Sequence, residues 1–275
     1  MKIALILPSR DRPNQWLRMV RSAATLASRP HDLTFYTALD EDDPQLKEYD
    51  EAGEEFAKVT SAKSFFHVFP KGTPRREMWD KLALKAVQKG ASYVWLGSDD
   101  IIFEAHAEQT GRTKEGLMIL DQLPPWDDTL MQVDAQVRAM WPDRHCIVWG
   151  WDGSCGEKHA THPFLTREWI AALGKTMPQC CEAFDGDTFQ TALARDLKRG
   201  VYVPSLYTIH HNPKYGKGEF DNTWKNARPV QKRDYEVYRS EVGQKEYHDS
   251  LATLRSAINK EAPVGTVVAQ SPSPA

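Results

Sequence analysis

Residues 75–103 read RREMWDKLALKAVQKGASYVWLGSDDIIF. The first half has the spacing and the residue types of a helix, which Gly90 ends. Tyr93 to Leu96 is a short apolar run of the kind that forms a buried strand, and Asp99 and Asp100 follow it closely. The segment therefore predicts a helix, a buried strand and two carboxylates at the carboxyl end of that strand.

Apolar runs of the same kind precede this segment. Ile3 to Leu7, Leu33 to Leu39 and Phe65 to Phe69 each read as a strand, and Trp16 to Ala24 has helical spacing. Alternating strands and helices predict an α/β fold, with a mostly parallel, mixed sheet flanked by helices and a ligand site at the carboxyl ends of the strands.

The later elements are expected to be shorter or more irregular. We expect helices at 131–140 and 187–199, strands at 146–149 and 201–203, a short strand and helix within 162–174, and one long surface helix at 233–259. Asp187 is the expected N-cap and Gly200 the expected stop of the 187–199 helix.

Composition excludes several classes of protein. The chain has 275 residues, 41% of them hydrophobic, which suits one main domain with a small appendage. Its net charge of -3 does not indicate a nucleic-acid or membrane protein, so attraction to a polyanion needs a local patch. No signal peptide or run of about eighteen apolar residues is visible, so we expect a cytoplasmic protein with no integral membrane contact.

Two carboxylates leaving a buried strand are costly to place unless a cation or solvent receives them. An exposed acidic turn is the alternative, because aspartate is a favoured turn residue. The cysteines leave a similar choice: reduced thiols are the simpler interpretation, and a zinc site is the other, although the spacing fits no familiar ligand pattern. The residues of that zinc hypothesis are Cys155, His159, His162 and Cys180.

Residues 75–103 resemble the central segment of nucleotide-sugar glycosyltransferases of the GT-A fold, specifically the inverting, family-2-like enzymes. Those enzymes have a helix, a glycine, a strand and then a D-x-D motif that holds a divalent cation on the donor diphosphate. The resemblance implies that Asp100 binds Mn2+ or Mg2+ here, in a DXD-like motif whose first aspartate is replaced by Ser98. It places further residues on the donor side, namely Arg76, Asp80, Ser98 and Asp99.

Residues 187–211, DTFQTALARDLKRGVYVPSLYTIHH, are similar to the family's helix, strand, proline and metal-binding histidine. The resemblance implies that Asp187 is the general base and that His210 completes the metal site. Gly186 replaces the usual glutamate, so Asp185 is a rival for the base. The opening of the chain is similar to the family's first strand and loop, and the second strand ends in aspartates. These parts imply donor contacts from Pro8, Ser9, Arg10, Asp11, Asp40 and Asp42.

Two further groups of residues have alternative interpretations. Trp149 and Trp151 alternate along one strand face, so with Asp152 they form either an acceptor platform or part of the core. A basic, aromatic stretch could close over the diphosphate, contact a polyanionic acceptor, or be a solvated loop. It contains Lys214, Tyr215, Lys217, Phe220, Trp224, Lys225, Arg228, Lys232 and Arg233, and Gly216 and Gly218 would permit a mobile lid.

The expected function is metal-dependent, inverting transfer of a sugar from a nucleotide diphosphate donor, with a UDP-sugar favoured, to an acceptor hydroxyl. The acceptor is a glycan or a modified DNA base, and a bacterial or bacteriophage enzyme is expected. The alternatives are a nucleotidyltransferase, whose usual glycine-rich opening loop is missing here, and a non-catalytic binding protein. We expect a catalytic domain over 1–212, a basic loop and C-terminal helix over 213–260, and a disordered tail over 261–275.

Overall fold

Strand β1 (Ile3–Pro8) lies inside the main sheet because its side chains are apolar on both faces. Ile3, Leu5 and Leu7 pack into one core cluster. Ala4 and Ile6 pack into the other cluster. A strand buried on both faces in this way is typical of parallel sheets that carry helices on each side. The computed structural model of the chain describes residues 1–104, 107–112, 118–122, 124–211, 213, 218 and 220–261.

The main sheet has eight strands in the order β3-β2-β1-β4-β9-β8-β10-β5. Strands β1 to β4 pair in parallel, and so do β8 and β10. β9 runs antiparallel between β4 and β8, and β5 runs antiparallel at the edge beside β10. The other bounds are β2 (Leu33–Asp40), β3 (Lys63–Phe69), β4 (Tyr93–Leu96), β5 (Ile101–Phe103), β8 (Ile147–Trp151), β9 (Phe164–Thr166) and β10 (Gly200–His210).

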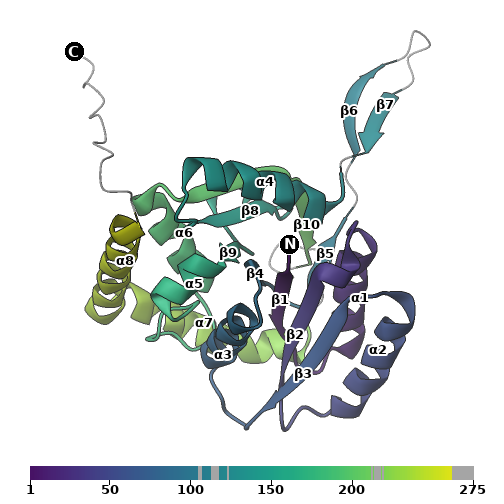
Figure 1. Ribbon diagram of the computed structural model, residues 1–275. Helices are drawn as coiled ribbons and strands as arrows, with labels where there is room; N and C mark the ends of the chain where they lie inside the picture. Colours follow the sequence, from purple (N-terminus) through teal and green to yellow (C-terminus); the bar gives the residue numbers. More distant parts are fainter. Residues whose placement is uncertain are drawn as a thin grey trace.

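Helices cover both faces of this sheet (Figure 1). One core cluster lies under α1 (Pro13–Thr25), α2 (Leu46–Val59) and α4 (Trp126–Met140). The other contains buried residues of α3 (Arg75–Gln88), α5 (Arg167–Leu173), α6 (Gly186–Leu197), α7 (Asn222–Arg239) and α8 (Glu241–Glu261). Two short 3-10 helices lie at Pro30–Asp32 and Gly156–Lys158. The expected α/β architecture is confirmed.

Several elements differ from the expectation. The sequence patterns did not reveal helix α2, nor the antiparallel hairpin β6 (Ala107–Arg112) and β7 (Met118–Gln122), which extends away from the main body (Figure 1). Helix α6 begins at Gly186, so Asp185 and not Asp187 is at the N-cap position. It ends at Leu197 because Lys198 adopts a left-handed conformation, and Gly200 already belongs to β10.

The expected single helix at 233–259 is two helices separated at Ser240. The chain turns there so tightly that a Cβ atom on Gly243 would lie 2.2 Å from the carbonyl oxygen of Tyr238. These helices are also not confined to the surface, because Tyr238, Tyr247, Leu251 and Leu254 are buried in the core. The expected tail lies, from residue 262 onwards, outside the described residues.

A search of the described residues finds no helix that is both long enough and apolar enough to cross a membrane.

Candidate active site

The candidate site lies where β1, β2 and β4 end and where β10 reaches β5. Parallel strands bring their carboxyl ends to the same edge of a sheet, so loops distant in sequence meet there. Ser9 follows β1, Asp40 ends β2, and Asp99 and Asp100 follow β4. His210 is the last residue of β10, opposite Ile101 in the antiparallel register.

Asp99 is buried and its carboxylate is held by the loop that follows β1. It accepts hydrogen bonds from Ser9 Oγ at 2.6 Å and from Arg12 Nη1 at 3.0 Å. Burial raises the pKa of Asp99, although the charge of Arg12 opposes that rise. Asp99 is therefore occupied in positioning Arg12 and the β1 loop.

Asp100 faces His210 instead. The carboxylate Oδ2 lies 3.4 Å from His210 Nε2, and Ser98 Oγ donates to Oδ1. The backbone completes the contact, because the amide of His211 donates to the Asp100 carbonyl at 2.8 Å. Burial alone would raise the pKa of Asp100, but the hydrogen bond and charge of His210 hold it below its usual range. Asp100 is thus an ionised carboxylate beside an imidazole.

His162 also belongs to this group, although the sequence analysis assigned it only to a zinc hypothesis. Its ring packs edge-on against His210, with centroids 4.9 Å apart, and Nδ1 lies 3.3 Å from the Leu96 carbonyl. Burial, followed by the charge of His210, lowers the pKa of His162 to about 4, so the imidazole is neutral. Its position just before β9, which pairs with β4, is a signal that only the strand order reveals.

These side chains fit a divalent cation that is shared with a diphosphate. No group of three or more His, Cys, Asp or Glu side chains could hold a metal ion alone, as far as the described residues go. Magnesium-type sites, however, often use one or two protein ligands and complete the shell with water and substrate phosphates. Asp100 and His210 offer such a pair, and the buried atoms His210 Nδ1 and His162 Nε2 have no hydrogen-bond partner among those residues.

The two candidate bases differ in environment. Asp187 lies in the first turn of α6, where Oδ1 accepts from the Thr188 amide at 2.8 Å and Oδ2 lies 3.0 Å from His159 Nε2. Burial would raise its pKa, but the contact with His159 keeps the pKa of Asp187 below its usual range. The Asp187 side chain is 34% exposed, and the Asp185 side chain is 10% exposed and 3.5 Å from Arg239. Ionisation and access both favour Asp187.

The β1 and β2 loops are joined through Arg10. Its guanidinium donates to Asp40 at 3.0 Å and to Asp42 at 2.5 Å, and this arrangement raises the pKa of Arg10 further. The amide of Asp11 donates to Asp43 at 2.9 Å, and Gln45 donates to the Asp11 carboxylate. Pro8, as the last residue of β1, begins this loop. The expected donor-side residues of the two loops thus lie together.

Arg76 and Asp80 lie elsewhere. Asp80 accepts from the Thr176 amide and hydroxyl, and Arg76 donates to Gln179 at 3.0 Å, so both side chains hold the 174–180 loop. Arg75 occupies the place expected for Arg76. Burial lowers the pKa of Arg75, while the charges of Asp99, Asp40 and Asp100 act on it in the opposite direction. The resemblance implied Arg76 and not Arg75, and one residue of helix turns a side chain by about 100°.

The expected acceptor platform is tied to local structure. Asp152 is buried and accepts from the amides of Ser154 and Cys155 and from the Thr161 hydroxyl, so its carboxylate shapes the turn after β8. Trp149 donates through Nε1 to the Gly156 carbonyl at 3.2 Å. The Trp151 ring lies so close to Gly156 that a Cβ there would be 2.7 Å from it. Both tryptophans therefore pack on the same turn.

The zinc hypothesis is not supported by the positions of its residues. His159 pairs with Asp187, His162 faces His210, and the Cys180 sulfur lies 3.9 Å from that of Cys181. Of the expected basic stretch, residues 214–217 lie outside the described residues.

A cavity of about 350 Å³ opens beside Asp100. The β1 loop, the first turns of α1 and the start of α7 form its wall, with Arg12, Gln15, Arg18, His211, Asp221 and Trp224 among the lining residues. A larger hollow of about 820 Å³ lies between α3, α5 and α8, and none of the candidate site residues lines it. The smaller cavity is therefore the one that adjoins the candidate active site.

Comparisons with known proteins bear on the fold. No protein-family model matches the chain, and the search of curated proteins found no match. Residues 1–349 of S. aureus TarS in complex with UDP align with a TM-score of 0.51 and 11% identity, over 94% of this chain and 81% of that chain. The mannosyltransferase PcManGT from Pyrobaculum calidifontis, in complex with GDP-Man and Mn2+, aligns with a TM-score of 0.50 and 11% identity, over 97% of this chain and 76% of that chain. The chain therefore has the GT-A type of glycosyltransferase fold, as the resemblance implied.

Proposed function

We propose that the protein is a metal-dependent glycosyltransferase that moves a sugar from a nucleotide diphosphate donor to an acceptor hydroxyl with inversion. The observation that carries this proposal is the pairing of Asp100 with His210, at 3.4 Å, where the chain passes from β4 to β5 and where β10 ends beside β5. The solved structures of the same fold contain UDP, or GDP-Man with Mn2+, which supports a nucleotide-sugar donor.

The nucleoside would occupy the edge formed by Pro8, Ser9, Arg10 and Asp40. Arg75 supports a diphosphate beside this edge, because its charge is near three carboxylates but no hydrogen bond or ion pair holds it among the described residues. Guanidinium groups bind phosphate oxygens strongly and in a fixed geometry. A UDP-sugar is the first donor to test.

Asp100 and His210 would hold Mn2+ or Mg2+ on the donor diphosphate, with His162 as a further imidazole. A cation bound there supplies positive charge that stabilises the diphosphate as it leaves. Because Asp100 is kept ionised, it is ready to bind such a cation at neutral pH.

Asp187 would act as the general base. It removes the proton of the acceptor hydroxyl, whose oxygen forms a bond to the anomeric carbon. The bond from that carbon to the diphosphate oxygen breaks, and the nucleoside diphosphate leaves with the bonding electrons. His159 keeps the Asp187 carboxylate ionised and oriented.

The test is a screen of UDP-, GDP- and dTDP-sugars for hydrolysis and transfer, with and without Mn2+. The Asp100→Asn variant should lose metal dependence and at least about a hundredfold in turnover, as expected when a group that stabilises the transition state is removed. Asp187→Asn should abolish transfer but leave donor binding intact. Asp50→Asn, an exposed change on α2, is the matched control.

Unchanged transfer by Asp187→Asn, with loss in Asp185→Asn, would reassign the base. Nucleotide binding without any turnover in the screen would indicate a binding protein that has kept the fold.

A further inference from the structure

Helix α7 is strongly basic in a chain that is acidic overall. Its eighteen residues include five Lys or Arg and two Asp or Glu, whereas the whole chain carries a net charge of -3. Such a local concentration of charge is the kind of patch through which an acidic protein attracts a polyanion.

Three of these cations are available to a partner. Lys225, Arg228 and Lys232 are exposed, and none forms an ion pair within the described part of the chain. Their spacing of three and four residues places them on one face of the helix, over about 10 Å at a rise of about 1.5 Å per residue. Arg233 and Arg239, in contrast, pair with Glu182 and Asp185.

Two exposed aromatic side chains lie along the same helix and its start. Phe220 and Tyr235 are 50% and 53% exposed. An arginine lies over each ring: Arg228 is 5.3 Å from the Phe220 centroid, and Arg239 is 3.4 Å from that of Tyr235. We call the set of Phe220, Lys225, Arg228, Lys232 and Tyr235 the α7 strip.

The α7 strip begins beside the candidate site. Asp221, the N-cap of α7, accepts hydrogen bonds from Arg12 Nε at 2.7 Å and from Arg12 Nη2 at 2.6 Å, and Trp224 lines the cavity next to Asp100. Figure 1 shows α7 (light green) behind α3 and below α5, on the side that leads to α8. A polymer that followed the strip would therefore lead into the cavity.

We propose that the α7 strip binds a strand of single-stranded nucleic acid. A single strand offers repeating phosphates to the three cations and unstacked bases to the two rings, which is the combination that basic, aromatic grooves bind without sequence preference. The strip is distinct from the groups assigned to the donor, so this inference goes beyond the proposed function and can fail separately from it.

The test uses the full chain and a fluorescein-labelled oligothymidylate of twenty nucleotides, with fluorescence anisotropy at several salt concentrations. The variant K225Q/R228Q/K232Q should bind at least about tenfold more weakly and should lower the slope of log K against log salt by about 2, since each phosphate contact to a single strand contributes about 0.7. F220A/Y235A should weaken binding by at least about thirtyfold, the loss of two stacked bases.

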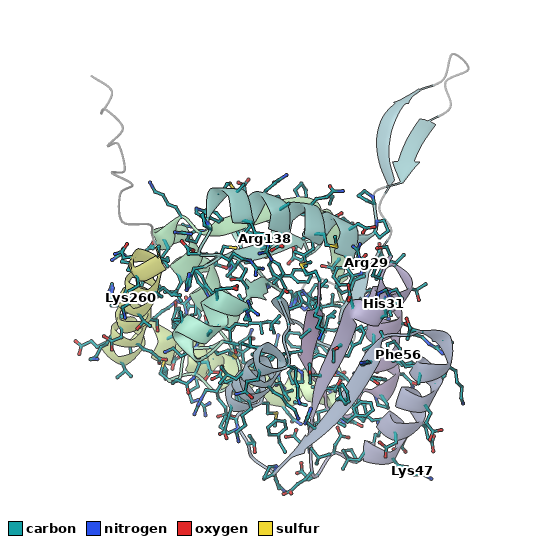
Figure 2. The ribbon with its side chains drawn as sticks, viewed as in Figure 1. Arg29, His31, Lys47, Phe56, Arg138 and Lys260 are labelled. Atoms are coloured by element: carbon teal, nitrogen blue, oxygen red, sulfur yellow. The ribbon has the colours of Figure 1, made fainter. Side chains whose placement is uncertain are left out.

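The matched control is K47Q/K58Q/K63Q, which removes the same charge from exposed positions on α2 and β3; Figure 2 labels Lys47 on the outer side of α2. This control should bind like the unmodified protein, and all variants should keep the same thermal midpoint and donor hydrolysis. Absence of binding by the unmodified protein would overturn the inference, as would unchanged binding by either strip variant or tighter binding to the matching duplex. If the unmodified protein bound the oligonucleotide but hydrolysed no donor, only the proposed function would be refuted.

Discussion

Arg75 and Arg76 are neighbours in sequence but act on different parts of the molecule. Arg75 lies near Asp40, Asp99 and Asp100, and Arg76 is bonded to Gln179. We therefore expect Arg75→Gln to weaken UDP binding by about ten- to a hundredfold, since a hydrogen bond to a charged group contributes about 1.5–3 kcal/mol. Titration calorimetry with UDP and Mn2+ measures this, and Arg76→Gln is the control, for which affinity should change less than threefold.

The contact between His159 and Asp187 predicts a pH-dependent contribution to stability. The hydrogen bond and charge of Asp187 raise the pKa of His159 above its ordinary value of about 6.5. The stabilisation is therefore complete below about pH 6.5 and is lost as pH rises through the higher, folded-state pKa. It amounts to less than about 1 kcal/mol because both side chains are partly exposed.

Thermal unfolding of the protein and of His159→Gln at pH 5.5 and pH 9 checks this. The difference in thermal midpoint between the unmodified protein and His159→Gln should be larger at pH 5.5 than at pH 9. A difference that is equal at both values, or larger at pH 9, would contradict the ionised pair.

At the residue scale, the sequence predicted only those positions that depend on where a strand ends. Asp100 was predicted because it follows a buried strand, whereas His210 was identified only through the resemblance to the family's metal-binding histidine. Arg75 was missed because its position depends on the rotation of helix α3 about its axis. His162 was missed because its position depends on the antiparallel pairing of β9 with β4, which the sequence does not specify. The prediction that Asp152 contacts the acceptor is not supported by its hydrogen bonds, because its carboxylate binds backbone amides of the turn. The sequence alone does not distinguish such a carboxylate from one that binds a ligand.

At the scale of elements, three helices hold the 174–185 loop that leads to Asp187. Asp234 on α7 accepts the amides of Glu182, Ala183 and Phe184 at 2.8–3.0 Å. Glu246 on α8 accepts the amide of Cys180 at 2.9 Å, and Asp80 on α3 accepts that of Thr176. The loop has little regular structure of its own, so these carboxylates determine where it lies.

Asp234→Ala should therefore destabilise the protein by about 3 kcal/mol or more, because it leaves three amides without the buried carboxylate that they share. Urea unfolding monitored by tryptophan fluorescence measures the change in the free energy of unfolding. The exposed neighbour Glu236→Ala is the control and should change it by less than about 0.5 kcal/mol. A loss as small as that of the control would show that the amides find other partners.

Strands β1, β2 and β4 were predicted correctly because they are apolar on almost every residue. Helix α2 was overlooked since it buries only Tyr49, Ala52 and Phe56, and Gly53 interrupts the pattern. The break at Ser240 was also overlooked, although serine is a favoured N-cap residue and Gly243 follows it three residues later.

At the scale of the whole molecule, a bound donor would contact loops of both halves of the sheet, so it should stabilise the entire fold. The complex of UDP with Mn2+, as one ligand at about a hundred times its dissociation constant, should contribute about 2.7 kcal/mol. For a chain of this size that corresponds to a rise of roughly 5 °C or more in the thermal midpoint. EDTA should reverse most of the rise, and Asp100→Asn should show a response to UDP that Mn2+ no longer changes. An equal response of Asp100→Asn to Mn2+ would place the cation elsewhere.

The pairing of β5 with β10 also has a consequence for how the protein is made. Ile101 and His210 are opposite each other in the sheet, but 109 positions separate them in the sequence. Contacts between such distant segments form late, since a long loop must close first. While the nascent chain is emerging, Asp100 lacks His210 and the proposed metal site is incomplete. Affinity for Mn2+ should therefore be absent until the last strand of the sheet has been added, which would make metal binding a reporter of completed folding.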